Sequence, residues 1–461
     1  MSAFTPPPMS QDLWHKIGVQ QHHGVNIFLP SLKRRNSLQG DILSLKMLLP
    51  WLKKTGFDVI QLLPINDSGT DISPYNIVSA HALNPGLLPP ESLKPLDKED
   101  PDFKKFQQTS AYWLRPYCLF KVLKEKNSQK AFWEWPQEEQ GYNDLLYLEY
   151  QEKALAYAYT QYLLHKEMKE LQEEASSLHI KLMGDLPILV SPDSAEVWQH
   201  PALFDKRYDA GAPPDYYEQE GQCWGFPLHR FEAMQEDNFT WWKERLKTAS
   251  FYYNLYRIDH VVGLFRLWAI PKGKKAKEGF FIPSEQSVWL PQGQIFLKAL
   301  LEGSPLLPIA EDLGVIPPEV RSTLTEDGIP GTKVPRWERY WDQGGAFISL
   351  KDYPVCSLTT VSTHDSQTLQ EWWSKENNRP LDQATRFELL RESHQSSSLF
   401  HINLLGEYLA LFKELVYNED TLERINIPGH LNNTNWRYRT KPFLEEILEH
   451  KELLRLMQKM I

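Results

Sequence analysis

Four carboxylate residues stand where short apolar runs of the sequence end. They are Asp185, Asp259, Glu311 and Asp365. Carboxylates brought into one site repel each other, so their pKa values separate. One can then stay ionised as a nucleophile while another keeps a proton as a general acid. Such a pair, about 5 Å apart, is what the retaining cleavage of a glycosidic bond requires.

Basic and imidazole side chains accompany two of these acids. Arg257 precedes Asp259 by two positions, His260 follows it directly, and His364 precedes Asp365. An Arg–Asp ion pair that only closes a strand end is the structural alternative for the first group. Because acids recur at four run ends, we favour a catalytic reading over four separate ion pairs.

The runs that carry these residues have the character of buried parallel strands. The run at 255–258 is short and mostly apolar, and the polar residues Asp259 and His260 follow it directly. In a (β/α)8 barrel the carboxyl ends of all strands meet at one mouth, where the chemistry is placed. We therefore predict an α/β fold, a (β/α)8 TIM barrel with large, mostly helical and loop insertions at its C-terminal face.

Further runs complete the predicted barrel. The expected strands are 22–30, 58–64, 179–187, 255–260, 308–314, 331–335, 358–365 and, as the eighth, 424–428. Between the first two, residues 41–55 carry apolar side chains at helical spacing, with Asp41 as the expected N-cap and Gly56 as the breaker. This strand–helix–strand order is a βαβ unit.

Two long stretches interrupt the pattern. Residues 65–177 contain helical periodicity around 101–126 and 142–177, which predicts a helix-rich insertion. Residues 188–237 look irregular and belong to a second insertion that extends to about 250; a loop of this length is usually functional. No repeat or long linker divides the chain, so we expect one catalytic barrel domain over residues 1–461.

The composition excludes several classes of protein. The 461 residues have a net charge of −10 and a pI near 5.8, unlike a nucleic-acid-binding protein. Cys118, Cys223 and Cys356 form no CxxC pair, and we expect neither a secretory signal nor a membrane span, which together predict a cytoplasmic location. Aromatic residues make up 12% of the chain, which suits a sugar-binding cleft.

Two other classes of function could use acids at strand ends. The pairs Asp259–His260 and His364–Asp365 could serve a metal-dependent barrel hydrolase, but no HxH or HExxH spacing occurs. A non-catalytic glucan-binding scaffold would not need an acid at Glu311. We therefore expect no metal in the site.

At these residues the chain closely resembles the 4-α-glucanotransferases called amylomaltases or disproportionating enzymes, relatives of the α-amylase superfamily. The resemblance extends from 14–19 to 435–437. It is carried by seven motifs: Ser-Pro-Tyr at 73–75, Gly-Asp-Leu-Pro at 184–187, the segments 211–215 and 221–225, Arg-Ile-Asp-His at 257–260, Ala-Glu-Asp-Leu-Gly at 310–314, and Thr-His-Asp at 363–365.

The resemblance implies a role for each residue of the site. Asp259 is implied as the nucleophile and Glu311 as the acid/base, while Asp365 holds sugar hydroxyls and stabilises the transition state. Arg257 is expected to keep Asp259 ionised through its fixed charge. The remaining implied substrate contacts are Tyr75, Asp185 and His364 at the donor site and Trp224 on the acceptor side. No cofactor and no metal are implied.

The implied reaction moves a segment of a 1,4-α-glucan to the 4-hydroxyl of glucose or another glucan. The donors would be maltooligosaccharides or glycogen-type glucans, without nucleic-acid or membrane partners. The main alternative is an α-glucan hydrolase that uses the same carboxylates, because the first half of the reaction is identical. One stretch departs from the family: residues 333–339 are more charged than the apolar segment expected there.

Overall fold

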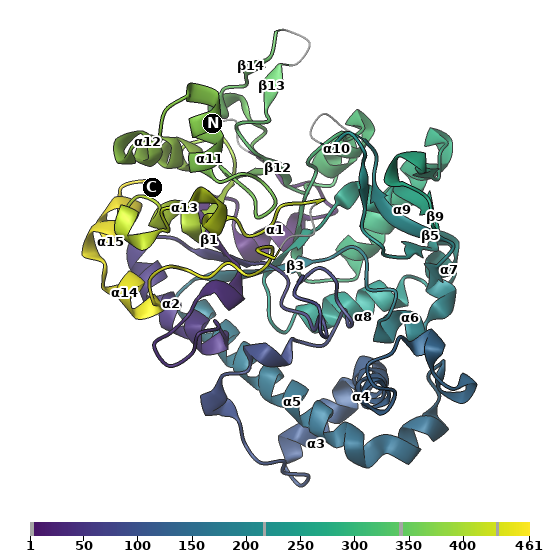
Figure 1. Cartoon of the computed structure of the whole chain (residues 1–461). Coiled ribbons are helices and arrows are strands. Elements are labelled where there is room, and N and C mark those ends of the chain that lie inside the picture. Colours follow the sequence, from purple (N-terminus) through teal and green to yellow (C-terminus); the bar gives the residue numbers. More distant parts are fainter. Residues whose placement is uncertain (1–3, 215–217, 341–343, 430–432) are drawn as a thin grey trace.

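The centre of the molecule is a closed barrel of eight parallel strands (Figure 1), as the sequence predicts. The computed structural model describes residues 4–214, 218–340, 344–429 and 433–461. The barrel strands are β1 (His22–Ile27), β2 (Val59–Leu62), β3 (Lys181–Leu186), β8 (Leu255–Ile258), β11 (Leu307–Ala310), β12 (Gly331–Lys333), β15 (Ser357–Thr359) and β16 (Phe400–Leu404). Their order around the barrel follows the chain, so β16 closes the barrel against β1.

The eighth strand is β16, and the prediction of a strand at 424–428 is wrong. β16 contains the buried polar residues His401 and Asn403, which hid it from a search for apolar runs. Asn403 is satisfied inside the protein: its Oδ1 accepts from the Val361 backbone at 2.8 Å, and its Nδ2 donates to Tyr408 at 3.1 Å. Polar side chains with internal partners are tolerated in a buried strand.

Helix α2 (Ile42–Thr55) begins and ends where the sequence predicts. The Asp41 side chain accepts a hydrogen bond from the Ser44 backbone N–H at 3.0 Å, and the Ser44 hydroxyl faces the Asp41 backbone N–H in return. Gly56 adopts a left-handed conformation with φ of 86°, which ends the helix. Pro50 lies inside the helix, which continues to Thr55.

The first insertion is helical, as predicted. Helices α3 (Pro101–Thr109), α4 (Ala111–Lys126) and α5 (Asp144–Ser177) pack together beside the barrel, in the lower part of Figure 1. Helix α5, 34 residues long, also packs against α2 and leads back into β3. The insertion is therefore continuous with the barrel wall.

The second insertion is more regular than predicted. A four-stranded antiparallel sheet has the order β10 (Phe280–Ile282), β9 (Leu267–Pro271), β5 (Tyr208–Ala212) and β6 (Gln222–Cys223). Within the insertion, β4 (Phe204–Asp205) pairs with β7 (Leu228–His229). A further two-stranded pair, β13 (Arg339–Tyr340) with β14 (Ala346–Phe347), lies outside the insertion, between β12 and β15. These strands are too short for a periodic pattern, and β5 finds its partner β9 beyond the barrel strand β8.

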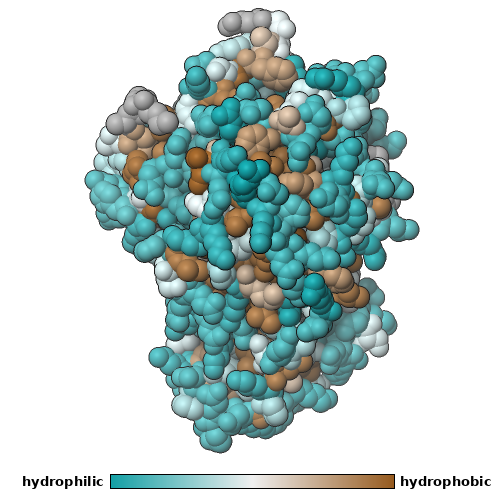
Figure 2. All heavy atoms as spheres, turned by 90° about the vertical axis from the view of Figure 1, so that its left-hand side faces the viewer, coloured by the Kyte–Doolittle hydropathy of each residue, from teal (hydrophilic) through white to brown (hydrophobic). Residues whose placement is uncertain are grey.

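The remaining helices surround the barrel and the insertions. They are α1 (Gln11–Ile17), α6 (Ala195–Gln199), α7 (Phe231–Glu236), α8 (Thr240–Ala249), α9 (Gln286–Glu302), α10 (Pro318–Glu326), α11 (Leu369–Asn377), α12 (Gln383–His394), α13 (Leu405–Leu409), α14 (Leu444–Glu449) and α15 (Lys451–Gln458). Figure 2 shows one face, on which hydrophilic side chains dominate and apolar ones form small separate patches. Within the described ranges, none of the helices combines the length and apolar character needed to cross a bilayer.

Candidate active site

The barrel register brings the strand-end residues to one level at the mouth. Asp185 in β3 lies beside Arg257 in β8, and Ile258 pairs with Ala310, so that Asp259 and Glu311 follow side by side. Gly184 permits this packing, because a Cβ there would lie 2.4 Å from the Tyr253 ring. Parallel pairing thus aligns four of the predicted residues without any help from the loops.

Arg257 is the hub of the site. Its Nη1 donates to both carboxylate oxygens of Asp185 at 2.8 Å and to Oδ1 of Asp259 at 3.1 Å. Its Nη2 lies 3.5 Å from Oε2 of Glu311. The Arg257 side chain is only 11% exposed, so solvent screens these contacts little. One fixed cation therefore holds three carboxyl groups in place.

Glu311 has the environment of a carboxylic acid that keeps its proton. Burial raises the pKa of Glu311 to about 8, the charge of Asp259 adds to this, and Arg257 opposes it. The backbone N–H of His260 donates to Oε2 of Glu311 at 2.6 Å. His260 takes a left-handed conformation, with φ of 46°, in the turn after β8. Such a conformation costs energy in a non-glycine residue and is characteristic of functional sites.

Asp365 has the opposite environment. Burial alone would raise the pKa of Asp365, but His364, 3.2 Å away, and Asn426 lower it to about 2. Asn426 donates from Nδ2 to Oδ1 of Asp365 at 2.7 Å. The Asp365 side chain is still 45% exposed. Asp365 is therefore an ionised acceptor that faces the open mouth.

Aromatic rings and imidazoles line the space between these acids. Tyr75 stacks on His364, with ring centroids 5.2 Å apart and planes 15° apart. The Tyr75 hydroxyl donates to Oδ2 of Asp185 at 2.8 Å. Trp436 contacts both rings, at 5.6 Å from Tyr75 and 5.8 Å from His364. Flat rings next to carboxylates match the C–H faces and hydroxyls of a sugar.

Trp224 joins the site from the second insertion. Its ring meets His260 edge-on, with centroids 4.9 Å apart, and its Nε1 donates to Gln222 at 3.1 Å. Burial lowers the pKa of His260 to about 4, so this imidazole is neutral at pH 7. Trp224 therefore lies on the side of the mouth next to Asp259.

Two residues of this site, Asn426 and Trp436, were missed as site residues in the sequence. Both lie in an irregular segment whose position depends on the folded barrel. Asn426 also falls within the stretch 424–428, which was incorrectly predicted as a barrel strand. The motif at 435–437 was a signal for the second, since it carried part of the resemblance.

The charged stretch 333–339 turns part of its charge inward. Lys333 is 8% exposed and lies 3.8 Å from both Asp312 and Glu338. Arg336 donates to the carbonyl oxygens of Val361 and Gln367, on either side of the Thr-His-Asp motif. These charges thus support the segment that carries Asp365. Across the described part of the chain, no group of three His, Cys, Asp or Glu side chains is placed to hold a metal ion.

Comparisons with known proteins agree with this geometry. The sequence model of the 4-alpha-glucanotransferase family matches residues 27–100 and 91–445. The 4-alpha-glucanotransferase of Chlamydia pneumoniae is 37% identical over 522 aligned residues, which cover 99% of this chain and 98% of that protein. The protein of the same name from Chlamydia caviae is 39% identical over 503, covering 95% and 94%.

The fold also matches a solved structure. The amylomaltase from Streptococcus agalactiae in complex with acarbose superimposes with a TM-score of 0.80 at 23% identity, covering 96% of this chain and 98% of that one. At this identity the likeness concerns the fold. The sequence relatives and the family match extend over nearly the whole chain, and on these grounds the chain belongs to the 4-alpha-glucanotransferase family.

Proposed function

We propose that this 4-alpha-glucanotransferase works by a retaining double displacement, with Asp259 as nucleophile, Glu311 as acid/base and Asp365 as the stabilising carboxylate. The observation that carries the proposal is the Arg257 hub, whose guanidinium donates to Asp259 at 3.1 Å and lies 3.5 Å from Glu311, the carboxyl whose pKa is about 8. Two neighbouring carboxyls in opposite protonation states are what this mechanism needs.

In the first half of the reaction Asp259 attacks the anomeric carbon of the donor. Glu311 gives its proton to the glycosidic oxygen, and the reducing-end segment of the glucan leaves. In the second half Glu311, now ionised, removes the proton from the 4-hydroxyl of the acceptor, which attacks the same carbon and releases Asp259. The two inversions preserve the α configuration.

The other predicted residues bind the donor sugar. Asp365 and His364 accept and donate hydrogen bonds to ring hydroxyls, and Asp185 is held ready for the same task by Arg257 and Tyr75. The Tyr75 ring forms the stacking surface, and Trp224 contacts the acceptor. The substrates we propose are maltooligosaccharides or glycogen-type α-glucans as donors and glucose or a glucan as acceptor. A cytoplasmic location stays a prediction.

Product analysis with maltotriose tests transfer directly. Transfer should give glucose together with a ladder of longer maltooligosaccharides, because a sugar hydroxyl intercepts the intermediate. Thin-layer or anion-exchange chromatography measures the products over time. If only glucose and maltose form, water is the acceptor and the hydrolase alternative is correct.

A further inference from the structure

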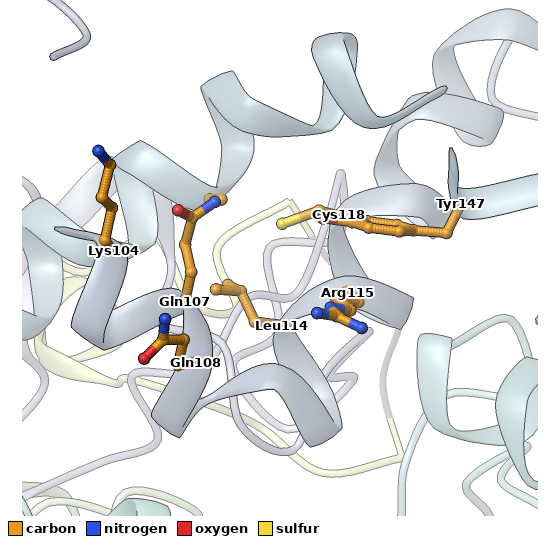
Figure 3. A pocket seen from close by; sticks show the side chains of 8 residues that line it. Lys104, Gln107, Gln108, Leu114, Arg115, Cys118 and Tyr147 are labelled. Atoms are coloured by element: carbon orange, nitrogen blue, oxygen red, sulfur yellow. The ribbon is translucent and has the colours of Figure 1, made fainter. Parts of the chain in front are cut away.

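A cavity of about 750 Å³ lies beside the barrel mouth, outside β1 and β16. It is bounded by the ends of these strands, by α13, by the first turn of α12 and by residues 416–425. Its volume falls in the range of about 300–1,000 Å³ usual for ligand sites. A second hollow, between α3, α4 and α5 (Figure 3), is smaller, about 250 Å³, and much of its rim consists of the exposed side chains Lys104, Gln108 and Arg115.

Part of the cavity wall is apolar. The residues concerned are Ile27, Phe28, Leu404, Leu405, Leu411 and Ile425. The rings of Tyr417 and Tyr438 also line it. Such a wall can receive the C–H faces of a pyranose.

The polar part of the wall is mostly preformed. Arg386 donates to Oε2 of Glu407 at 2.9 Å, and the side chains of the pair are 3% and 4% exposed. Oε1 of Glu407 accepts from the Leu369 backbone at 2.8 Å. In contrast, Oδ1 of Asn26 is buried and has no hydrogen-bond partner among the described residues. A buried acceptor of this kind calls for a donor from a ligand or a water molecule.

The remaining groups offer hydrogen bonds more than charge. Glu423 accepts from the Tyr417 backbone at 2.6 Å, and burial raises the pKa of Glu423 to about 7. At neutral pH Glu423 can therefore both donate and accept. Asp382 is occupied as the N-cap of α12, which leaves Asp420 and Lys413 as charges of opposite sign. A neutral, hydroxyl-rich ligand fits this set better than an ion.

The cavity and the barrel mouth share a wall. Phe28, Ile425 and Tyr438 form one cluster, against which Trp436 packs. Trp436 also contacts Tyr75 and His364 in the mouth. Ile425 also directly precedes Asn426, which holds Asp365. A ligand in the cavity would thus lie one layer of side chains from the catalytic site.

We infer that this cavity is a second sugar site, which binds glucose or the end of a short α-glucan through Asn26, Asp420 and Glu423 and through its apolar wall. The inference rests on the proposed function, since a glucan-converting enzyme works among these ligands. It adds a site that does not overlap the carboxylates of the mouth.

Gly406 provides a way to fill the cavity. It lines the cavity from α13, and a Cβ there would meet only the Tyr438 hydroxyl oxygen, at an ordinary contact distance of 3.5 Å. The Cβ of Gly406→Leu therefore fits without strain, and the rest of the leucine side chain should fill part of the cavity. Gly406→Ala is the matched control. Ala410→Leu, from the next turn of the same wall, provides a second filling variant if Gly406→Leu does not fold.

The experiment uses full-length Asp259→Asn protein, in which bound sugars are not converted. Crystals soaked separately with glucose and with maltotriose, together with calorimetric titrations of the same ligands, should show two occupied sites. Adding Gly406→Ala should keep both, whereas adding Gly406→Leu should leave sugar in the mouth alone and remove one binding event. Comparison of the glucose experiment with the maltotriose experiment shows which of the two sugars fills the cavity and so identifies the preferred chain length.

Three outcomes overturn the inference: sugar only in the mouth of Asp259→Asn, sugar in the cavity of the crystal without a second event in solution, or a second event that survives both filling variants. Failure of the proposed function is distinct, because it would appear as wild-type protein that forms no ladder from maltotriose. The cavity can fail to bind sugar in an enzyme that forms the ladder, and an enzyme that forms no ladder can still bind sugar in the cavity.

Discussion

The division of labour between Asp259 and Glu311 can be tested by trapping the intermediate. Asp259→Asn should reduce turnover by a factor of about 10⁴ with every donor, since no covalent intermediate can form. Glu311→Gln should still react with α-glucosyl fluoride, whose leaving group needs little acid assistance. The glucosyl-enzyme should then accumulate, because its attack by an acceptor lacks the base. Mass spectrometry should find the sugar on the peptide that contains Asp259.

The matching control is Asp259→Asn mixed with the same fluoride, which should carry no adduct. A sugar on Glu311 in that protein, or on Asp365 in either variant, would falsify the assignment of the nucleophile.

The pH dependence of catalysis follows from the raised pKa of Glu311. The acid form is required for the first step, so kcat/KM should fall as the pH rises through about 8. The charge of Asp365 contributes to this raised pKa. Asp365→Asn should therefore move the alkaline limb to lower pH, besides reducing the rate. pH–rate profiles with maltotriose, whose leaving sugar oxygen needs the proton, measure both effects. An unmoved limb would mean that a group other than Glu311 controls it.

At the scale of single elements, the start of α2 combines a helix cap with a buried ion pair. Asp41 accepts from the Ser44 backbone and also pairs with Arg34 at 2.5 Å, both side chains being nearly inaccessible. Asp41→Ala should lower the free energy of unfolding by about 1–2 kcal/mol for the cap. Leaving Arg34 without this partner adds to the loss. Urea unfolding of the purified variants measures both.

Asp41→Asn separates the two contributions, because an amide oxygen can still cap the helix but carries no charge. It should lie between wild type and Asp41→Ala. Equal losses in the two variants would show that the cap contributes nothing and that the ion pair dominates.

Elements with regular local patterns could be predicted from the sequence. Helix α2 was fixed by its apolar spacing together with Asp41 and Gly56, and strands such as β8 by short apolar runs that end in polar groups. β16 could not be found in this way, because His401 and Asn403 break the run and their partners come from other elements. The antiparallel sheet that contains β5 could not be predicted for a related reason. Its strands are short, and β5 pairs with β9, which is distant in sequence.

The candidate site followed the same rule. Residues on or next to barrel strands, such as Asp185 and Asp259, were predictable because parallel strands end at one place. Asn426 and Trp436 lie on an irregular segment, and only tertiary contacts decide that they reach Asp365 and Tyr75. Segments of this kind carry no periodic signal of their own.

At the scale of the whole molecule, three histidines near the start of β1 and β16, two of them buried and His23 half-buried, predict how stability depends on pH. His23 meets His394 at 2.9 Å between Nδ1 atoms and stacks on His401 at 4.9 Å. Burial lowers the pKa of His23 to about 4 and of His401 to about 3, and that of His394 falls well below its usual value.

Because these folded-state pKa values are depressed, the unfolded chain binds more protons below about pH 6.5. Stability from the three histidines should therefore be complete above that pH and decline as the pH falls toward about 4. His23→Gln should flatten this decline, measured as the melting temperature between pH 4 and 7. The exposed His179, changed to Gln, is the control and should leave the slope as in wild type. A slope that His23→Gln does not change would assign the acid sensitivity to other groups.

The closure of the barrel between β1 and β16 has a consequence for synthesis on the ribosome. The register pairs His22 with Phe400, so the first strand cannot obtain its second neighbour until more than four-fifths of the chain has been translated. Until then β1 and the last strand to emerge each present an open edge, which invites pairing with other chains. Nascent chains stalled before residue 400 should accordingly depend on chaperones, whereas release of β16 from the exit tunnel completes the ring in one step.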